Sequence, residues 1–156
     1  MEEFFSNQDE PGMLKSRDTF NALIKEQVDK GIPASRIVLG GFSQGGAMAL
    51  FTGTTHSEKL AAIFGLSCYL PLSNKINDFI PQDFPNKQTP LFMGHGDIDG
   101  VVKFEFGEKS AEHLKEMGMS VEFHKYKLVD PIPVNSNSSD YLLLFVFVMI
   151  FPYAAT

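Results

Sequence analysis

One glycine-flanked serine is the residue of this 156-residue sequence whose setting best suits covalent chemistry. The pentapeptide 41–45 reads Gly-Phe-Ser-Gln-Gly; an apolar run precedes it and small residues follow it. When a strand enters such a pentapeptide and a helix leaves it, the serine lies on a strained turn. Flanking glycines such as Gly41 and Gly45 then leave room where a Cβ would clash. The pattern predicts that Ser43 is a nucleophile and that the Gln44 N–H donates to an oxyanion.

The same glycines also admit a structural interpretation, in which they only allow a helix to pack closely on a strand, as in a nucleotide-binding turn. That interpretation is weaker, because the G-x-G-x-x-G spacing of a dinucleotide site does not occur in this segment. We therefore expect serine-hydrolase chemistry at this position.

Two aspartates follow a later apolar strand, in the segment 95–102 (His-Gly-Asp-Ile-Asp-Gly-Val-Val). In hydrolases whose serine lies in such a turn, the acid follows the nucleophile along the chain and a histidine follows the acid. An acid in a tight turn at the carboxyl end of a strand can hold an imidazole in one tautomer. Asp97 and Asp99 both qualify, and the structural alternative is that they cap the turn by accepting backbone N–H bonds. The residues alone do not choose between them.

The general base should be a histidine downstream of the acid, and only His113 and His124 lie there. His113 falls in the middle of a predicted helix and His124 inside a predicted strand, and neither position suits a base at the end of a sheet. We therefore expect that the catalytic histidine is absent from this chain. The loss of that residue from a serine triad lowers turnover by a factor on the order of 10⁶.

Alternating helix and strand patterns indicate one α/β sandwich with a mainly parallel sheet. Helices are predicted over residues 13–30, 44–54 and 104–117, and strands over 36–40, 60–67, 90–94 and 119–127. The continuous apolar character of the first strand suggests a central strand that is covered on both faces. A long connection over residues 69–88 is of the kind that often carries function.

Composition limits the partners and the location. The net charge of −6 and the pI of about 5.1 disfavour nucleic acid as a partner, because an acidic surface repels phosphates. The single cysteine, Cys68, fits a reducing compartment, and the N-terminus lacks the pattern of a signal peptide. We expect a cytoplasmic protein, with the nucleus as a second location.

The C-terminal part differs in composition from the rest. Residues 130–139 are rich in Pro, Asn and Ser, and residues 142–151 form an unbroken apolar decamer. About 20 apolar residues are needed to cross a bilayer as a helix. We interpret the decamer as a buried or aggregation-prone β segment, with a membrane-touching tail as the alternative. Residues 1–127 are predicted to form the α/β domain and residues 128–156 a divergent linker and apolar tail.

Three segments resemble the acyl-protein thioesterase and lysophospholipase family, which comprises phospholipase/carboxylesterase-type α/β-hydrolases. They are residues 31–47 around the serine, residues 66–72 (Leu-Ser-Cys-Tyr-Leu-Pro-Leu) and residues 95–102 with the acid turn. The resemblance implies a nucleophile at Ser43 and an orienting acid at Asp99.

The resemblance further implies that Gln44 donates to the oxyanion and that Leu70 and Pro71 line an acyl channel. It implies palmitoylated protein cysteines and lysophospholipids as substrates, no cofactor or metal, and at most transient contact with a membrane surface.

Two departures from the family pattern are also expected. The N-terminal strands, with the loop that supplies a second oxyanion donor, and the C-terminal helix are missing, so the chain is expected to be an incomplete α/β-hydrolase sandwich, truncated at both ends. Impaired catalysis follows from the missing histidine. The alternatives are a non-catalytic remnant that binds acyl chains and an unstable fragment.

Overall fold

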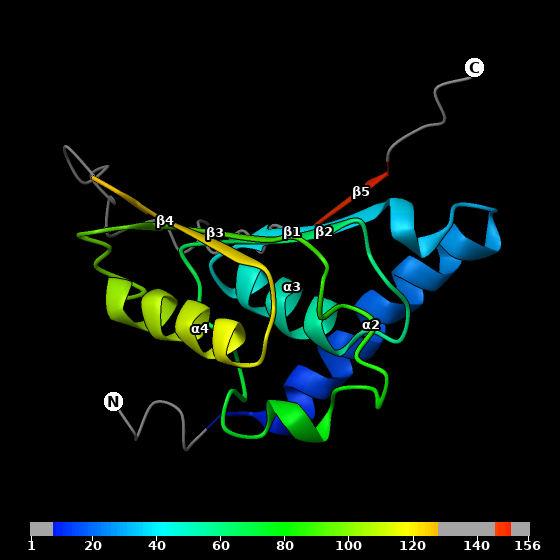
Figure 1. Ribbon diagram of the computed structural model, residues 1–156, viewed down its shortest axis with the longest axis horizontal. Helices are drawn as coiled ribbons and strands as arrows, with labels where there is room; N and C mark the ends of the chain where they lie inside the picture. The colour runs from blue at the N-terminus through cyan, green and yellow to red at the C-terminus, as the bar shows by residue number, and fades with distance from the viewer. Residues whose placement is uncertain (1–7, 128–145, 151–156) are drawn as a thin grey trace, which may run out of the picture.

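A computed structural model describes residues 8–127 and 146–150, and the fold is one sheet with helices packed on it (Figure 1). The helices are α2 (Glu10–Asp29), α3 (Gln44–Thr55) and α4 (Phe104–Glu116), with short 3₁₀ turns at Ala34–Arg36 and Ile76–Asp78. The strands are β1 (Ile37–Phe42), β2 (Ala62–Leu66), β3 (Leu91–Gly96), β4 (Val121–Tyr126) and β5 (Val146–Ile150).

The sheet has the strand order β4-β3-β2-β1-β5. Strands β1 to β4 are parallel to one another, and α-helices form two of the three connections between them, α3 between β1 and β2 and α4 between β3 and β4, which confirms the predicted α/β class. The largest difference at a helix start is in α2, which begins at Glu10, three residues before the predicted start. The cause is a cap: the Asp9 carboxylate accepts a 3.1 Å hydrogen bond from the Gly12 N–H, and Pro11 suits the first turn.

All three helices lie on the same face of the sheet (Figure 1). Strand β1 is nevertheless buried from Ile37 to Gly41, as the prediction of a strand covered on both faces requires, and only Phe42 at its end is exposed. The core lies between the sheet and the helices and contains fully buried side chains such as Leu39, Leu50 and Phe51. On the opposite face, Phe42 and Leu66 stay exposed.

Strand β4 follows the predicted alternation. Val121 and Phe123 are half-buried on the helix side, whereas Glu122 and His124 are exposed. His124 stacks on Phe92 of the neighbouring strand β3, with ring centroids 5.3 Å apart. Aromatic side chains therefore shield part of the sheet face that no described helix covers.

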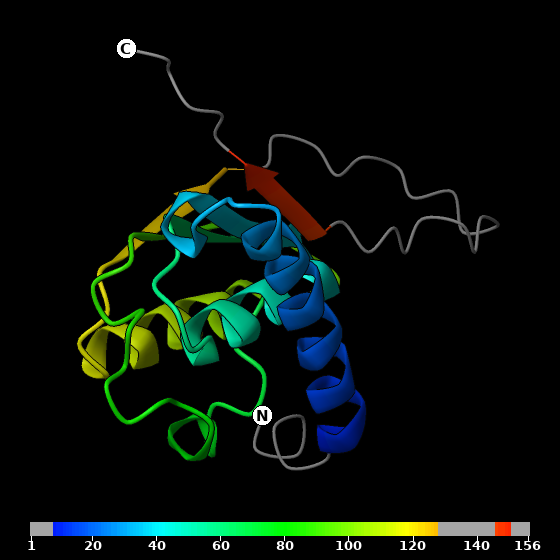
Figure 2. The same cartoon turned by 90° about the vertical axis from the view of Figure 1, so that its right-hand side faces the viewer.

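The apolar C-terminal segment contributes strand β5, as the β interpretation predicts, and the rest of residues 128–156 lies outside the described part. Strand β5 runs antiparallel to β1, with Val146 opposite Gly41 and Ile150 opposite Ile37. Figure 2 shows it at the sheet edge away from β4. No helix among the described residues is long and apolar enough to span a membrane.

A buried histidine at the C-terminal end of α3 makes the fold sensitive to acid. The His56 Nδ1 lies 2.9 Å from the Asn21 Oδ1, while its buried Nε2 finds no partner among the described residues. Burial lowers the pKa of His56 below its usual value of 6.5, and the nearby Glu58 carboxylate opposes the shift. The neutral imidazole is thus the form that the folded chain favours.

We expect the free energy of unfolding to fall as the pH drops below about 6.5, because the unfolded chain then binds a proton that folded His56 resists. The slope is at most about 1.4 kcal/mol per pH unit for this one group. Urea unfolding between pH 7.5 and pH 5 should show a flatter dependence in His56→Gln and a steeper one in Glu58→Gln. An unchanged dependence in both variants would show that another group controls acid unfolding.

Candidate active site

Ser43 lies on a strained turn between β1 and α3. Its backbone has φ 53° and ψ −125°, a conformation that non-glycine residues rarely adopt and that costs about 1–3 kcal/mol. The Ser43 N–H donates to the Leu66 carbonyl at 2.8 Å, and the Ser43 carbonyl accepts from the Ala47 N–H at 2.9 Å. Bonds to the sheet on one side and to the helix on the other therefore hold the turn.

One glycine of this segment has a clear steric reason. A Cβ on Gly46 would lie 2.8 Å from the Gly41 carbonyl oxygen and 3.0 Å from the Cys68 Sγ, so a side chain there would push the helix off the strand. Gly41 and Gly45 are both buried beside this contact. Their predicted role in leaving room for the serine stays a prediction.

The start of α3 supplies hydrogen-bond donors next to the serine. The first N–H groups of a helix have no intrahelical acceptor, and the helix dipole adds partial positive charge there. Gln44 is the first residue of α3, directly after Ser43, so the geometry is compatible with the predicted oxyanion donor. That role also stays a prediction.

The carboxyl ends of the parallel strands are tied together by backbone hydrogen bonds. Besides the bond from Ser43 to Leu66, the Ser67 N–H donates to the Gly94 carbonyl at 2.8 Å and the Asp97 N–H to the Tyr126 carbonyl at 2.9 Å. The turn at Ser43 and the turn at Asp97 to Asp99 therefore both lie at the end of the sheet where the parallel strands have their carboxyl ends. Two strand spacings, about 10 Å, separate β1 from β3, with β2 between them, so the two turns are not adjacent.

Asp99 caps its own turn. Its Oδ1 accepts hydrogen bonds from the N–H groups of Val101 at 2.9 Å and Val102 at 3.0 Å. Asp99 therefore caps the turn, as the structural alternative predicted. The side chain is only 14% exposed, and its Oδ2 lies 3.6 Å from the His95 Nε2, beyond hydrogen-bond distance. Such a cap fixes the direction of the carboxylate, and an acid that orients an imidazole needs this rigidity.

His95 supports the acid turn from below, a role that the sequence pattern did not reveal. The imidazole is 1% exposed, and its Nε2 lies 2.8 Å from the Val102 carbonyl. It packs against α4, where a Cβ on Gly107 would lie 2.2 Å from the His95 Nδ1. A glycine inside a predicted helix was the signal that something packs closely against it.

None of the four histidines occupies the space between the serine and the acid. His56 lies at the far end of α3, about 18 Å along the helix from Ser43. His95 is buried beneath the acid turn, and His113 lies toward the C-terminal end of α4. His124 lies opposite Gly94 on the exposed sheet face and pairs with Glu122. The absence of a catalytic histidine from this chain stays a prediction.

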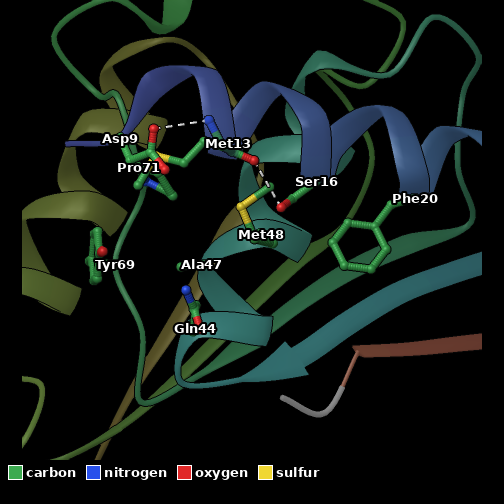
Figure 3. A pocket seen from close by; sticks show the side chains of 10 residues that line it. Asp9, Met13, Ser16, Phe20, Gln44, Ala47, Met48, Tyr69 and Pro71 are labelled. Carbon is green, nitrogen blue, oxygen red and sulfur yellow. Dashed lines mark hydrogen bonds between the residues drawn. The ribbon is translucent and has the colours of Figure 1, made fainter.

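A cavity of about 250 Å³ opens beside the serine turn, between α2 and α3 (Figure 3). Its wall is mostly apolar and consists of Asp9, Gly12, Met13, Ser16, Phe20, Gln44, Ala47, Met48, Tyr69 and Pro71. Pro71 lines this cavity, whereas the side chain of Leu70 is fully buried in the core and its N–H donates to the Ser110 Oγ at 2.8 Å. The assignment of both residues to an acyl channel stays a prediction.

The described residues contain no group of three or more His, Cys, Asp or Glu side chains that is arranged to hold a metal ion. Cys68 is buried directly behind the serine turn, and burial raises the pKa of its thiol far above the usual value. The cysteine is therefore a packing residue, and Ser43 stays the predicted nucleophile.

Comparison with known proteins agrees with this geometry. The phospholipase/carboxylesterase family model matches residues 1–136. The chain belongs to this family. It is 57% identical over 138 residues to acyl-protein thioesterase 1 of Emericella nidulans, a match that covers 85% of this chain and 58% of that protein. It is 59% identical over 121 residues to acyl-protein thioesterase 1 of Aspergillus fumigatus, covering 77% of this chain and 50% of the relative.

Solved structures show the same fold. The crystal structure of Arabidopsis thaliana SOBER1 superposes with a TM-score of 0.71 at 30% identity, over 78% of this chain and 57% of that one. A phospholipase/carboxylesterase from Dyadobacter fermentans gives 0.66 at 27% identity, over 79% and 57% of the two chains. The chain thus spans little more than half the length of these family members, and its sheet is a partial α/β-hydrolase sheet.

We expect Gly107→Ala to lower the free energy of unfolding by about 1–3 kcal/mol, although alanine is the better helix former, because the added methyl group meets the His95 ring. Gly100→Ala is the matched control in the same region, since no atom lies within 4 Å of the added Cβ. Urea unfolding of both variants measures the difference. Equal stabilities would show that the His95 contact does not support the turn.

Proposed function

We propose that this chain carries the nucleophile and the acid of a serine hydrolase that cleaves fatty-acyl thioesters from S-acylated protein cysteines. The observation that supports it best is the strained Ser43 turn, which lies at the same sheet edge as the capped Asp99. The relatives named acyl-protein thioesterase 1 point to acylated proteins as the substrate class. Oxyesters such as lysophospholipids belong to the same proposal, because the attack on the acyl carbon is identical.

The chemistry assigns a role to each residue of the site. The Ser43 Oγ forms a bond to the acyl carbon while the Gln44 N–H stabilises the oxyanion. The C–S bond then breaks, and the departing thiolate takes up the proton that the hydroxyl lost. Water then attacks the acyl-enzyme, the ester C–O bond breaks, and a proton from that water restores the Ser43 hydroxyl as the fatty acid leaves. Asp99 orients the base that carries the proton in both steps.

The cavity between α2 and α3 is where we place the acyl chain. Met13, Phe20 and Met48 provide apolar wall, and Gln44 joins the cavity to the serine turn (Figure 3). An apolar cavity with a few polar groups at its mouth is typical of a small-molecule site. Pro71 contributes to this wall, whereas Leu70 supports it from the core.

The base is the group that this chain's histidines do not supply at the site. Without a base the serine hydroxyl is a weak nucleophile at neutral pH, so hydrolysis by the isolated chain should be slower by a factor on the order of 10⁶ than with a complete triad. Imidazole added to the solution can supply the missing general base. This provides a direct test of the half-site.

We expect added imidazole to accelerate the hydrolysis of a medium-chain acyl thioester in proportion to its concentration. Liberated thiol, followed with a chromogenic reagent, measures the rate. Ser43→Ala should show only the rate of imidazole in buffer, and Asp99→Ala should respond less steeply than wild type. Ser57→Ala, an exposed serine beyond the far end of α3, is the control that keeps the full response.

Labelling with a fluorophosphonate gives a second readout of the same serine. Slow labelling of the full chain that imidazole accelerates, and that Ser43→Ala abolishes, supports the proposal. A folded chain whose thioester hydrolysis in imidazole equals that of Ser43→Ala would refute it.

A second candidate function is the binding of acyl chains without turnover, which the apolar cavity supports independently of any base. A fluorescent fatty-acid analogue should then bind saturably. Met13→Asp places a carboxylate in the cavity wall and should weaken binding at least ten-fold, equivalent to about 1.4 kcal/mol. Thr19→Asp adds the same charge on an exposed position of α2 and should leave the affinity unchanged. Equal affinities for the two variants would place the analogue elsewhere.

A further inference from the structure

Strand β5 pairs with the strand that leads into the nucleophile. Five residue pairs join it to β1, from Ile37 opposite Ile150 to Gly41 opposite Val146. The last pair lies only two residues before Ser43. The family model ends its match at residue 136, so this strand comes from a part of the chain beyond the region shared with the family.

Strand β1 is a poor strand by its own composition. Two of its six residues, Gly40 and Gly41, are glycines, which weaken a strand because they lose more freedom on folding and offer no side chain to pack. The strand nevertheless leads into the turn at Ser43, where the positive φ of 53° is unfavourable for a non-glycine residue. Such turns persist only where the surrounding structure determines them from several sides. Pairing on both edges of β1 provides this.

The two edges of β1 are used by alternate residues. The Ile37 carbonyl accepts from the Ala61 N–H, and the Ser43 N–H donates to Leu66, so odd-numbered residues direct their backbone groups to β2. Neighbouring residues of a strand point to opposite edges, and therefore Val38 and Gly40 face β5. Their partners are Met149 and Phe147, whereas the N–H of Val148 points away from β1.

We propose that residues 146–150 are a docking strand that fills the open edge of β1 from within the same chain and stiffens the turn that presents Ser43. The inference concerns the shape of the turn and does not depend on catalytic activity. It gives the apolar residues 146–150 a structural role that involves neither a membrane nor catalysis.

Amide hydrogen exchange of the full-length chain, followed by NMR, tests the proposal. Phe147→Pro removes a donor that faces β1, and we expect exchange of Val38 and Gly40 to speed up at least about ten-fold. Exchange of Ser43 should rise as well, because its turn loses support. Leu39 and Gly41, which face β2, should keep their protection.

Val148→Pro is the matched control, because its missing N–H faces away from β1 and a proline is tolerated there on an edge strand. It should leave the exchange of Val38, Gly40 and Ser43 close to wild type. Equal exchange in the two proline variants would overturn the proposal. Loss of protection at Leu39 and Gly41 in Phe147→Pro would also overturn it, since β5 would then belong to the folding core and would not be a separable docking strand.

The source of the strand is tested by dilution. A strand docked within one chain protects Val38 and Gly40 equally at every protein concentration. Protection that rises with concentration, together with a dimer in sedimentation, would show that a second copy provides the strand and would overturn the intramolecular assignment.

Discussion

The backbone conformation of Ser43 is the constraint on which the rest of the site depends. A serine with φ 53° is stable only because β2 and α3 hold it from both sides, through the bonds to Leu66 and Ala47. The requirement reaches beyond the turn. It explains the close approach of Gly46 to Gly41, the burial of Cys68 behind the turn, and the need for a sheet that fixes the direction of β1. The position of the proposed nucleophile follows from this geometry.

Most of the described fold could be predicted because its signals are local. The apolar strand, the glycine-flanked serine and the small residues of α3 are contiguous in sequence, so the strand-turn-helix unit around Ser43 needs no distant information. Parallel strands bring their carboxyl ends to one edge, and this placed the acid turn near the serine without any knowledge of contacts. The choice of Asp99 over Asp97 came from family resemblance; the structure adds that Asp99 caps the turn.

The features that escaped prediction all depend on contacts between distant segments. The pattern of β1 shows that it is apolar but not that all three described helices lie on one face of the sheet. Leu70 was predicted to line an acyl channel; in the structure its N–H donates to the Ser110 Oγ of α4 and its side chain is buried in the core. His95 was considered only as part of a motif, because its packing against Gly107 joins residues that are 12 positions apart. The pairing of β5 with β1 could not be predicted either, because it depends on which edge of the sheet is free for a further strand.

The acid turn and the serine turn are built independently of the base that would connect them. Asp99 is held by its own backbone donors, and His95 and Gly107 support that turn from the side of α4. Ser43 is held by β2 and α3. Because neither set of contacts involves an imidazole between the two residues, the half-site can keep its shape whether or not a base is bound there. The rate of hydrolysis therefore depends on a base, whereas the positions of Ser43 and Asp99 depend on the sheet and the helices.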